Sequence, residues 1–392
     1  MRIAVVHSFY ASGQPSGENE AVRDQVRALR AAGHEVKLFA AHTDELARRP
    51  SYPLRAALRV ATGWGTDPLP RLLAYAPDVV HVHNLFPNFG RSWVREWGGP
   101  LVATLHNYRP LCAGATLYRE GAKCTRCPDG DRWAGLRHGC YRGSRAATLP
   151  LAWAGRHGAA ADPLLGRADR LVVLSELSLR MYLRTGMPAG RLVLVPNFVD
   201  APQDEVPPDD TGRWLVAARL SAEKGVLELL GQWPADQPLD VVGDGELLAE
   251  CRSVAPPSVR FLGRLDRAEL RRRLPSWRGL VFPSRCYEGA PCLEVEALAA
   301  GLPIVAFAGS SVAESVRERG TGVVTRWDQP LGEVLADATT RFPSLRARCR
   351  QVYADHLTEQ VWTARMTGLY ADLTGPGTTG EPVRRNSGTD SR

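Results

Sequence analysis

The chain has 392 residues, 44% of them hydrophobic and 23% charged, an ordinary globular composition at a length that favours two α/β domains over one. No apolar run approaches the roughly 20 residues needed to span a bilayer, and the opening MRIAVVHSF turns polar too soon for a signal peptide, so we expect a cytoplasmic protein. The net charge of +7 is uneven, because residues 1–200 carry 26 basic and 16 acidic side chains and residues 201–392 carry 23 and 26.

The first segments in chain order predict a Rossmann-like start. The apolar run RIAVVHSF predicts a buried strand, and the polar loop SGQPSGENEA follows it. Helical spacing of Ala21, Val22, Val26 and Leu29 predicts a helix that closes at Gly33, and HEVKLFA predicts a second strand. This order is typical of nucleotide-binding α/β domains, although the sequence lacks the dinucleotide fingerprint G-x-G-x-x-G.

Two further strands of the first half end in the same polar pair. DVVHVHN (78–84) and PLVATLHN (100–107) each finish with histidine and asparagine. Active sites of open α/β sheets lie at the carboxyl ends of the strands, so His83 and His106 are well placed for function. A lone histidine is more often structural, but two at equivalent strand ends favour a functional role.

A cysteine-rich segment follows the second of these strands. Cys112, Cys124, Cys127 and Cys140 fall within 29 residues, and the middle two form a C-x-x-C pair. Four thiolates can hold one tetrahedral zinc ion, so the segment predicts a structural zinc site. Reduced thiols without metal and disulfides stay open as alternatives, and a cytoplasmic location argues against stable disulfides.

The second half begins after a segment without periodicity. DAPQDEVPPDDTG at 200–212 is rich in proline and aspartate, which predicts a linker. RWLVAA then opens a second α/β domain, and the loop R-L-S-A-E-K-G places Arg219 and Lys224 before the next helix. Two cations in front of a helix N-terminus favour a phosphate or another anion, with a solvated charged turn as the alternative.

The stretch PSRCYEGAPCLEVEALAAGLPIV at 283–305 carries two unusual glutamates. It predicts the end of a strand, a tight loop and a short buried helix over 291–300, with proline in the first helical position. Glu294 and Glu296 lie about 200° apart on this helix, so they cannot share one solvent face. Because a buried carboxylate needs a partner, Glu288 and Glu296 predict hydrogen bonds to hydroxyls of a polar ligand at the helix N-terminus; two surface glutamates are the alternative.

These motifs resemble a known family. E-G-x-P, a second glutamate eight positions after the first and A-L-A-A-G-L-P-I-V resemble the signature of glycosyltransferase family four, the retaining GT-B enzymes of group one. R-L-x-x-x-K-G and the loop Ser16-Gly17-Glu18 resemble two further family motifs, and the cysteine segment after H-N-Y-R resembles one subgroup. The resemblance implies an α/β GT-B fold of two facing Rossmann-like domains with an interdomain cleft. Ser16 and Ala290 depart from the family's usual glycine and aromatic residue.

The resemblance also implies roles for single residues. Glu288 and His106 would contact the donor sugar, and Glu296 would bind the ribose hydroxyls. Arg219 and Lys224 would hold the diphosphate and would complete a catalytic set with His106 and Glu288. The other donor-binding residues would lie beside the sugar, the diphosphate or the base: Gly17, Asn197, Gly243, Arg264, Leu265, Gly289, Ala290, Pro291, Cys292 and Leu293.

The expected organisation has an acceptor domain over 1–199, with the cysteine-rich insertion at about 108–142, and a nucleotide-sugar domain over 213–357. A closing helix over 358–374 is expected to cross back onto the first domain. The polar tail at 375–392 has no apolar content to bury and is expected to be disordered.

We therefore expect a retaining hexosyltransferase that moves a sugar from a UDP- or GDP-sugar to an acceptor hydroxyl, in polysaccharide, glycolipid or glycosylated natural-product biosynthesis. Two cations at the diphosphate would make a catalytic metal unnecessary, which leaves structural zinc as the one metal expected. The basic first half indicates either general arginine bias or peripheral contact with a membrane, and no nucleic-acid partner is expected. A nucleotide-sugar epimerase of the same fold and an inactive, zinc-stabilised binding protein are the alternatives.

Overall fold

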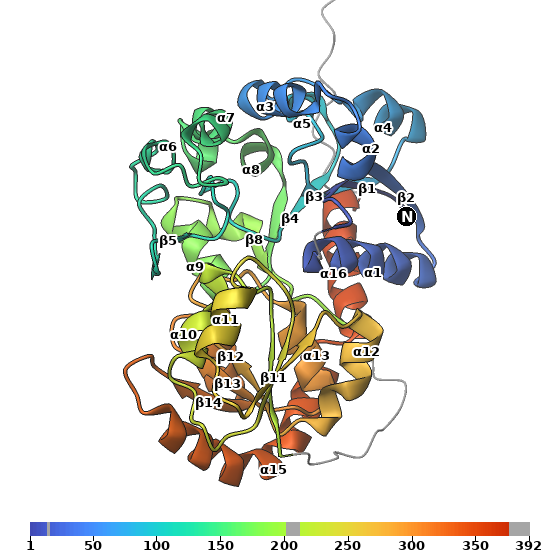
Figure 1. The fold of residues 1–392 in the computed structure, drawn as a ribbon. Coiled ribbons are helices and arrows are strands. Elements are labelled where there is room, and N and C mark those ends of the chain that lie inside the picture. The colour runs from blue at the N-terminus through green and yellow to red at the C-terminus, as the bar shows by residue number, and fades with distance from the viewer. Residues whose placement is uncertain (14–15, 201–211, 376–392) are drawn as a thin grey trace, which may run out of the picture.

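The computed structural model describes residues 1–13, 16–200 and 212–375 and has two α/β domains, the first above the second in Figure 1. Each domain has a six-stranded parallel sheet, in the orders β2-β1-β3-β4-β7-β8 and β11-β10-β9-β12-β13-β14. The inner strands of both sheets are near-continuous buried runs of mostly aliphatic residues, which is typical of parallel sheets covered by helices on both faces, whereas the edge strands β2, β8, β11 and β14 are only partly buried. The expected architecture of two Rossmann-like domains is confirmed.

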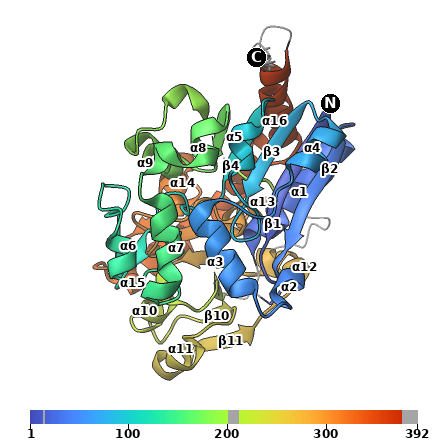
Figure 2. The ribbon, with the colours of Figure 1, turned by 90° about the horizontal axis from the view of Figure 1, so that it is seen from above.

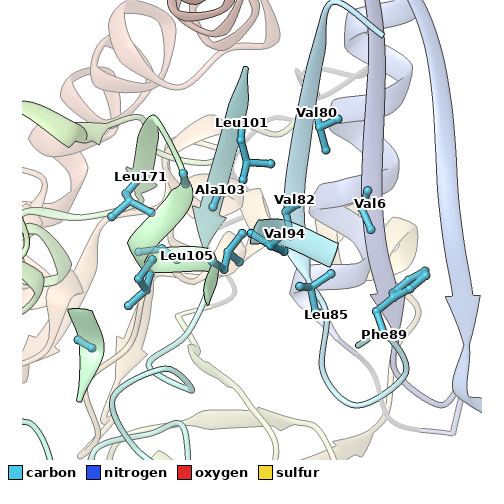
Figure 3. Close-up of a cluster of buried hydrophobic side chains, with 14 of the residues drawn as sticks. Val6, Val80, Val82, Leu85, Phe89, Val94, Leu101, Ala103, Leu105 and Leu171 are labelled. Atoms are coloured by element: carbon cyan, nitrogen blue, oxygen red, sulfur yellow. The ribbon is translucent and has the colours of Figure 1, made fainter. Parts of the chain in front are cut away.

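The first domain is built on strand β1, which pairs with β2 on one side and β3 on the other. Aliphatic side chains of β1, β3, β4 and β7 form one core layer, shown in Figure 3. The strands are β1 (Arg2–Phe9), β2 (Glu35–His42), β3 (Val79–Asn84), β4 (Leu101–Leu105), β7 (Arg170–Val173) and β8 (Leu192–Leu194). The helices are α1 (Gly17–Ala31), α2 (Thr43–Ala47), α3 (Tyr52–Thr62), α4 (Leu69–Tyr75), α5 (Trp93–Glu96), α7 (Arg145–Gly155), α8 (Pro163–Arg167) and α9 (Glu176–Arg184).

In the second domain the first strand, β9, lies between β10 and β12. The strand order reverses there, and ligands of open α/β sheets bind outside the carboxyl ends of strands at such a point. The strands are β9 (Trp214–Ala217), β10 (Leu239–Val242), β11 (Val259–Gly263), β12 (Gly279–Phe282), β13 (Ile304–Phe307) and β14 (Gly322–Thr325). The helices are α10 (Val226–Leu230), α11 (Leu248–Val254), α12 (Arg267–Arg273), α13 (Cys292–Ala299), α14 (Ser311–Arg319) and α15 (Leu331–His356).

The last helix, α16 (Glu359–Thr374), leaves the second domain and runs along the first, as the red helix in Figure 1 shows. Trp362, Met366 and Tyr370 are buried in the core beneath α1 and β1. The hydroxyl of Tyr370 also lies 2.7 Å from Nδ1 of the buried His81 on β3. The helix therefore fastens the end of the chain to the first domain.

The cysteine-rich segment contains the hairpin of β5 (Tyr118–Arg119) and β6 (Ala122–Lys123) and the short helix α6 (Ala134–Arg137). The hairpin contacts the second domain at three points. Tyr118 donates a hydrogen bond to the carbonyl of Ala222 (3.1 Å), Arg285 donates to the carbonyl of Gly121, and Lys123 donates to a carbonyl of the loop after β13. This hairpin is thus a bridge between the domains.

The first turn of α13 differs from the expectation. Helix α13 begins at Cys292 and not at Pro291, because Pro291 has an extended backbone (φ −70°, ψ 128°) and is the N-cap.

The expected linker and tail fall largely on residues 201–211 and 376–392, which lie outside the described residues. Within the described parts of the chain, no helix has the length and apolar character required to cross a bilayer.

Candidate active site

The loops after β9 and β12 meet at the point where the strand order reverses. Lys224 ends a short turn after β9, and the next residue, Gly225, has φ +70°. A Cβ at Gly225 would lie 2.2 Å from the carbonyl oxygen of Pro283, so only glycine lets this loop pack against the end of β12. Lys224 is thereby directed toward the glutamate loop.

Lys224 and Glu288 form a partly buried ion pair, with 25% and 13% of their side chains exposed. Nζ of Lys224 donates to Oε1 of Glu288 (2.6 Å), and Oγ of Ser284 donates to the same oxygen (2.7 Å). Burial works against both charges, but Lys224 keeps the pKa of Glu288 below its ordinary value, and Glu288 keeps the pKa of Lys224 above its own. Both groups are therefore charged at neutral pH.

Arg219 lies on the same loop as Lys224 but has a different partner. Its Nη2 donates to Oε1 of Glu223 (2.6 Å), and 57% of its side chain is exposed. The two predicted cations are therefore close in sequence, one buried against the glutamate loop and the other reaching into solvent.

Glu296 is buried in α13 and bonded to a cation. Nε of Arg267 donates to Oε1 of Glu296 (2.7 Å), and Nη1 of Arg267 donates to Asp24 on α1 of the first domain (2.9 Å). Cys292, at the start of the same helix, has its sulfur 3.8 Å from the carbonyl oxygen of Gly17. The start of α13 therefore lies against the start of α1.

The loop that precedes α13 touches the first domain at the carboxyl end of β4. A Cβ at Gly289 would lie 2.5 Å from the carbonyl oxygen of His106, so a larger residue would push the domains apart. Tyr108 donates a hydrogen bond to the carbonyl of Glu288 (3.4 Å), and Ala290 packs against the core of the first domain. The carboxyl ends of the two sheets meet at this loop.

His83 and His106, at the ends of β3 and β4, are in contact. Nδ1 of His83 lies 2.9 Å from Nε2 of His106. Burial lowers the pKa of His106 to about 3 and holds the pKa of His83 well below its ordinary value. Both rings are neutral at neutral pH, so they can orient a ligand by hydrogen bonding but are not imidazolium acids.

The remaining predicted donor-site residues are distributed over several loops. Gly243 directly follows β10, and Arg264 and Leu265 directly follow β11. Arg264 is exposed, whereas Leu265 packs against the core of the second domain. Asn197 is buried against the first domain, where its side-chain oxygen accepts a hydrogen bond from Gln25 on α1 (3.3 Å). Leu293, in the first turn of α13, also packs against the second-domain core.

Sequence patterns did not single out Glu18 by itself, and the structure partly buries this residue at the start of α1. Oε2 of Glu18 accepts a hydrogen bond from Nδ2 of Asn107 (3.0 Å). Its Oε1 is buried and has no hydrogen-bond partner among the described residues. Burial raises the pKa of this carboxyl to about 7. Its position in the S-G-E loop was a signal, but the sequence did not show that the side chain turns inward.

The four clustered cysteines, all free, line one small pocket together with His138. All four are partly buried, and burial raises the pKa of the Cys127 thiol to about 11. Across residues 1–13, 16–200 and 212–375, no three His, Cys, Asp or Glu side chains are arranged so that they could hold a metal ion as they stand. The thiols converge without forming a finished coordination site.

A larger pocket lies in the first domain beside His106. Its cavity volume is about 110 Å³, and it is walled by α3, α7 and the ends of β3 and β4. We call it the α3/α7 pocket. Phe86, Phe89 and Leu151 supply apolar wall, and Arg59 and Arg109 supply cations. An apolar pocket with a few convergent polar groups is typical of a site for a small ligand.

Comparison with known proteins agrees with this geometry. The model of glycosyltransferase family 4 matches residues 15–202, and that of glycosyl transferases group 1 matches residues 211–342. Comparison with curated proteins gives no match.

Solved structures share the fold at low identity. Sucrose-phosphate synthase from Thermosynechococcus elongatus is 19% identical at a TM-score of 0.63, over 95% of this chain and 98% of that one. HepE of Anabaena in complex with UDP is 15% identical at a TM-score of 0.58. The lipopolysaccharide outer core galactosyltransferase WaaB is 14% identical at a TM-score of 0.59. Both comparisons cover 95% of this chain and 100% of the other. With two parallel-sheet domains meeting at their carboxyl ends and family models over both, the chain belongs to the group-one glycosyltransferases of family 4 and has the GT-B fold.

Proposed function

We propose that the protein transfers a sugar from a nucleoside diphosphate sugar to an acceptor hydroxyl, with retention of the anomeric configuration. The observation that carries this proposal is the ion pair of Lys224 and Glu288. Glu288 lies on the loop that touches His106 and leads into α13. A cation, a helix N-terminus and hydroxyl-binding groups from both domains converge there. This set suits a diphosphate with a sugar attached.

The electrostatics suit departure of a nucleoside diphosphate. Negative charge develops on the leaving phosphate. In this proposal Lys224, Arg219 and the N-terminus of α13 are the positive groups that stabilise it. Glu288, fixed by Lys224 and Ser284, would accept hydrogen bonds from sugar hydroxyls. Glu296 would bind the ribose hydroxyls with its second oxygen while Arg267 holds the first.

Retention is proposed from the family resemblance. The protonation states are compatible with it, because His83 and His106 are neutral and Lys224 and Glu288 neutralise each other, so none of the four is an activated nucleophile for a covalent intermediate. In the retaining reaction that the resemblance implies, the acceptor oxygen attacks the anomeric carbon from the face that the diphosphate leaves. The new glycosidic bond forms as the bond to the phosphate oxygen breaks, and that oxygen takes the proton of the acceptor hydroxyl.

Uridine nucleotides are the first donors to test. HepE, which shares the fold across nearly the whole chain, has been solved with UDP and with UDP-glucose. The loops after β10 and β11 are expected to recognise the base through backbone groups, so the side chains do not identify which base binds.

A thermal-shift screen of UDP, GDP, ADP and TDP and their sugars tests the proposal. At about 100 times its Kd, a ligand of the folded state adds about 2.7 kcal/mol of apparent stability, so one nucleotide should raise the Tm by several degrees. Retention is then read by NMR from the anomeric configuration of the product. If no nucleoside diphosphate shifts the Tm, the proposal is wrong; if the donor binds and only its own sugar is altered, the protein is an epimerase.

We also propose that the thiols of Cys112, Cys124, Cys127 and Cys140 bind one structural zinc ion. Two observations support this: the four cysteines line one pocket, and the segment around them has little regular secondary structure. The segment has two strands of two residues and one helical turn, and Ala115, Leu117 and Glu120 have positive φ. A zinc ion would require the four thiols to turn toward this pocket and form the tetrahedral set that zinc prefers.

A further inference from the structure

Polar side chains from three neighbouring strands meet the start of α1. Tyr10 directly follows β1, Asn84 ends β3 and Asn107 lies two residues after β4, and these strands are adjacent in the first sheet (Figure 2). Nδ2 of Asn84 donates to the hydroxyl of Tyr10 (2.9 Å), and Nδ2 of Asn107 donates to Oε2 of Glu18 (3.0 Å). The two asparagines therefore hold a phenol and a carboxyl at the carboxyl edge of the sheet.

The asparagine side chains are themselves held in place. Oδ1 of Asn84 accepts from the backbone N–H of Phe86, and Oδ1 of Asn107 accepts from the backbone N–H of Arg109, each at 2.9 Å. Each asparagine closes its own turn with its oxygen and keeps its NH₂ group for the junction. The second residue of each repeated histidine-asparagine pair is therefore a fixed hydrogen-bond donor.

Tyr10 and Glu18 each keep one hydrogen-bonding function unused. Among the described residues, Oε1 of Glu18 is buried without a hydrogen-bond partner, and no group accepts the hydroxyl proton of Tyr10. No hydrogen bond joins these two side chains there, yet they are near each other, because burial and then the charge of Glu18 raise the pKa of the phenol. A hydroxyl can donate and accept at once, so one hydroxyl of a ligand can satisfy both.

Glu18 lacks a hydrogen-bond donor and not a counter-charge. Burial raises the pKa of its carboxyl to about 7, and the bond from Asn107 and the nearby charge of Arg109 both act in the opposite direction. A buried carboxylate oxygen without a donor is costly, and a neutral donor is enough to satisfy it when a cation is already close. The missing partner is therefore a neutral group such as a hydroxyl.

Tyr10 and Glu18 lie between the α3/α7 pocket and the proposed diphosphate site. Asn84 and Asn107, which bond to them, line that pocket. The residue before Glu18, Gly17, has its carbonyl oxygen 3.8 Å from the sulfur of Cys292, the first residue of α13. An acceptor that extends from the pocket toward the start of α13 therefore passes these two side chains.

The hydroxyl bound there is not the one that reacts. In the proposed reaction the attacking hydroxyl gives its proton to the departing phosphate oxygen, so that proton is committed and cannot also serve Glu18. The hydroxyl that donates to Glu18 is a second one, close to the first on the same acceptor. Sugars and other compounds with hydroxyls on neighbouring carbon atoms meet this requirement.

We propose that Tyr10 and Glu18 bind the hydroxyl next to the attacking one and thereby determine which hydroxyl of the acceptor is glycosylated. This inference rests on the proposed function and adds the residues that set its regioselectivity. Glu18 accepts a hydrogen bond from the neighbouring hydroxyl, and Tyr10 donates one to it. Neither residue forms or breaks a bond during transfer.

The first arm of the test measures regioselectivity. It uses the donor that the thermal-shift screen identifies, with the methyl α-glycosides of glucose, galactose and mannose as acceptor probes and NMR of the products to read the linkage. Tyr10→Phe removes only the phenol oxygen. In Glu18→Gln, Asn107 keeps the amide oxygen on its own side, so an NH₂ group replaces Oε1. Each variant should lower the preference for the native linkage by about fivefold and raise the acceptor KM, with the donor KM unchanged.

Tyr75→Phe is the matched control for Tyr10→Phe. The hydroxyl of Tyr75 donates to the carbonyl of Glu35 at the amino end of β2 (3.0 Å), the end of the sheet opposite to the junction. This variant also loses a tyrosine hydrogen bond in the first domain, but it should keep the native linkage and both KM values. A general loss of packing would instead affect both tyrosine variants.

The second arm uses monodeoxy analogues of the same glycosides. The analogue without the neighbouring hydroxyl should react about fivefold more slowly with the native protein. With that analogue Tyr10→Phe should react as fast as the native protein, because the contact that it removes is already gone.

Independent, multiplying losses in the second arm overturn the inference, and so does an unchanged linkage in both junction variants, since an ordered water or a purely structural role would give these results. Transfer to none of the glycosides, by a protein whose Tm the donor raises, overturns it as well and leaves donor binding intact. If no nucleotide raises the Tm, the failure is that of the proposed function.

Discussion

The two sides of the junction differ in how their charges are arranged; we call the second-domain side, where the donor is proposed to bind, the donor side, and the first-domain side, where the acceptor is proposed to bind, the acceptor side. On the second domain, Lys224 is paired with Glu288, and Arg267 is paired with Glu296. On the first domain, Arg59 and Arg109 each donate a terminal nitrogen to a carbonyl, and among the described residues their Nε atoms have no hydrogen-bond partner. Oε1 of Glu18 also lacks a hydrogen-bond partner there, and burial raises the pKa of this carboxyl, although the charge of Arg109 is near enough to lower it in part. On the donor side, both cations already have acidic partners, so a ligand has to bind between groups that are paired without it. The acceptor side is incomplete until a ligand arrives.

The difference indicates two kinds of recognition. A paired cation and carboxylate are held in fixed positions, which suits precise orientation of a reacting diphosphate and sugar. Buried groups without hydrogen-bond partners, such as Nε of Arg59 and Oε1 of Glu18, gain most from a ligand group that completes their hydrogen bonds, which suits selection among acceptors. Variants that break one side should therefore change different measurements from variants that break the other.

The largest effect is expected from breaking the donor-side pair. Lys224→Met should lower kcat/KM by about 10²–10³-fold, because it removes a charge aimed at the leaving phosphate. It should also cost about 3 kcal/mol of stability, because Glu288 would be left buried and uncompensated. The double variant Lys224→Met with Glu288→Gln should recover much of the stability and none of the activity, as read by thermal unfolding and donor turnover. Recovery of activity in the double variant would mean that the pair has only a structural role.

The same contrast sets what the sequence could reveal. Lys224 and Gly225 lie in one short motif, and Glu288 and Gly289 lie in another, so local spacing was enough to place them at strand ends. The α3/α7 pocket joins segments from residue 59 to residue 164, and no single motif encodes it. Helix α7 was not predicted, because its small residues and the internal Pro150 give no clear helical pattern. Pairing of Glu296 with Arg267 also required the fold, because 29 residues separate them.

An intermediate effect is expected from the cysteine segment, whose hairpin bridges the two sides. The purified protein should contain about one zinc per chain by elemental analysis, and Cys124→Ser should lose it. Because the hairpin bonds to the loops that carry Ala222 and Arg285, loss of zinc should raise the donor KM by several-fold more than it lowers kcat. Cys251→Ala, in the second-domain core, is the control and should keep its zinc. If the native protein contains no zinc, the zinc proposal is wrong, whereas the proposal for donor binding is unaffected.

The smallest effect is expected from Glu18, the partly buried acid at the start of α1. Its pKa in the folded protein is about 7, above its ordinary value of 4.5, so the folded state favours the protonated form. The stability that this preference contributes is fully present below about pH 4.5 and is lost as the pH rises through 7. Glu18→Gln imitates the protonated acid, so the Tm of the variant relative to the native protein should rise by about 2–4 °C between pH 5 and pH 8.

Glu20→Gln provides the control for this prediction, because Glu20 lies in the same helical turn but is paired with Arg23 at the surface. Its difference in Tm from the native protein should not change with pH. If the Glu18 difference is equally flat, the carboxyl is ionised at little cost and a group of the junction must neutralise it. Glu18 would then have a partner as the donor-side carboxylates do, and the contrast between the two sides would rest on the Nε atoms of Arg59 and Arg109 alone.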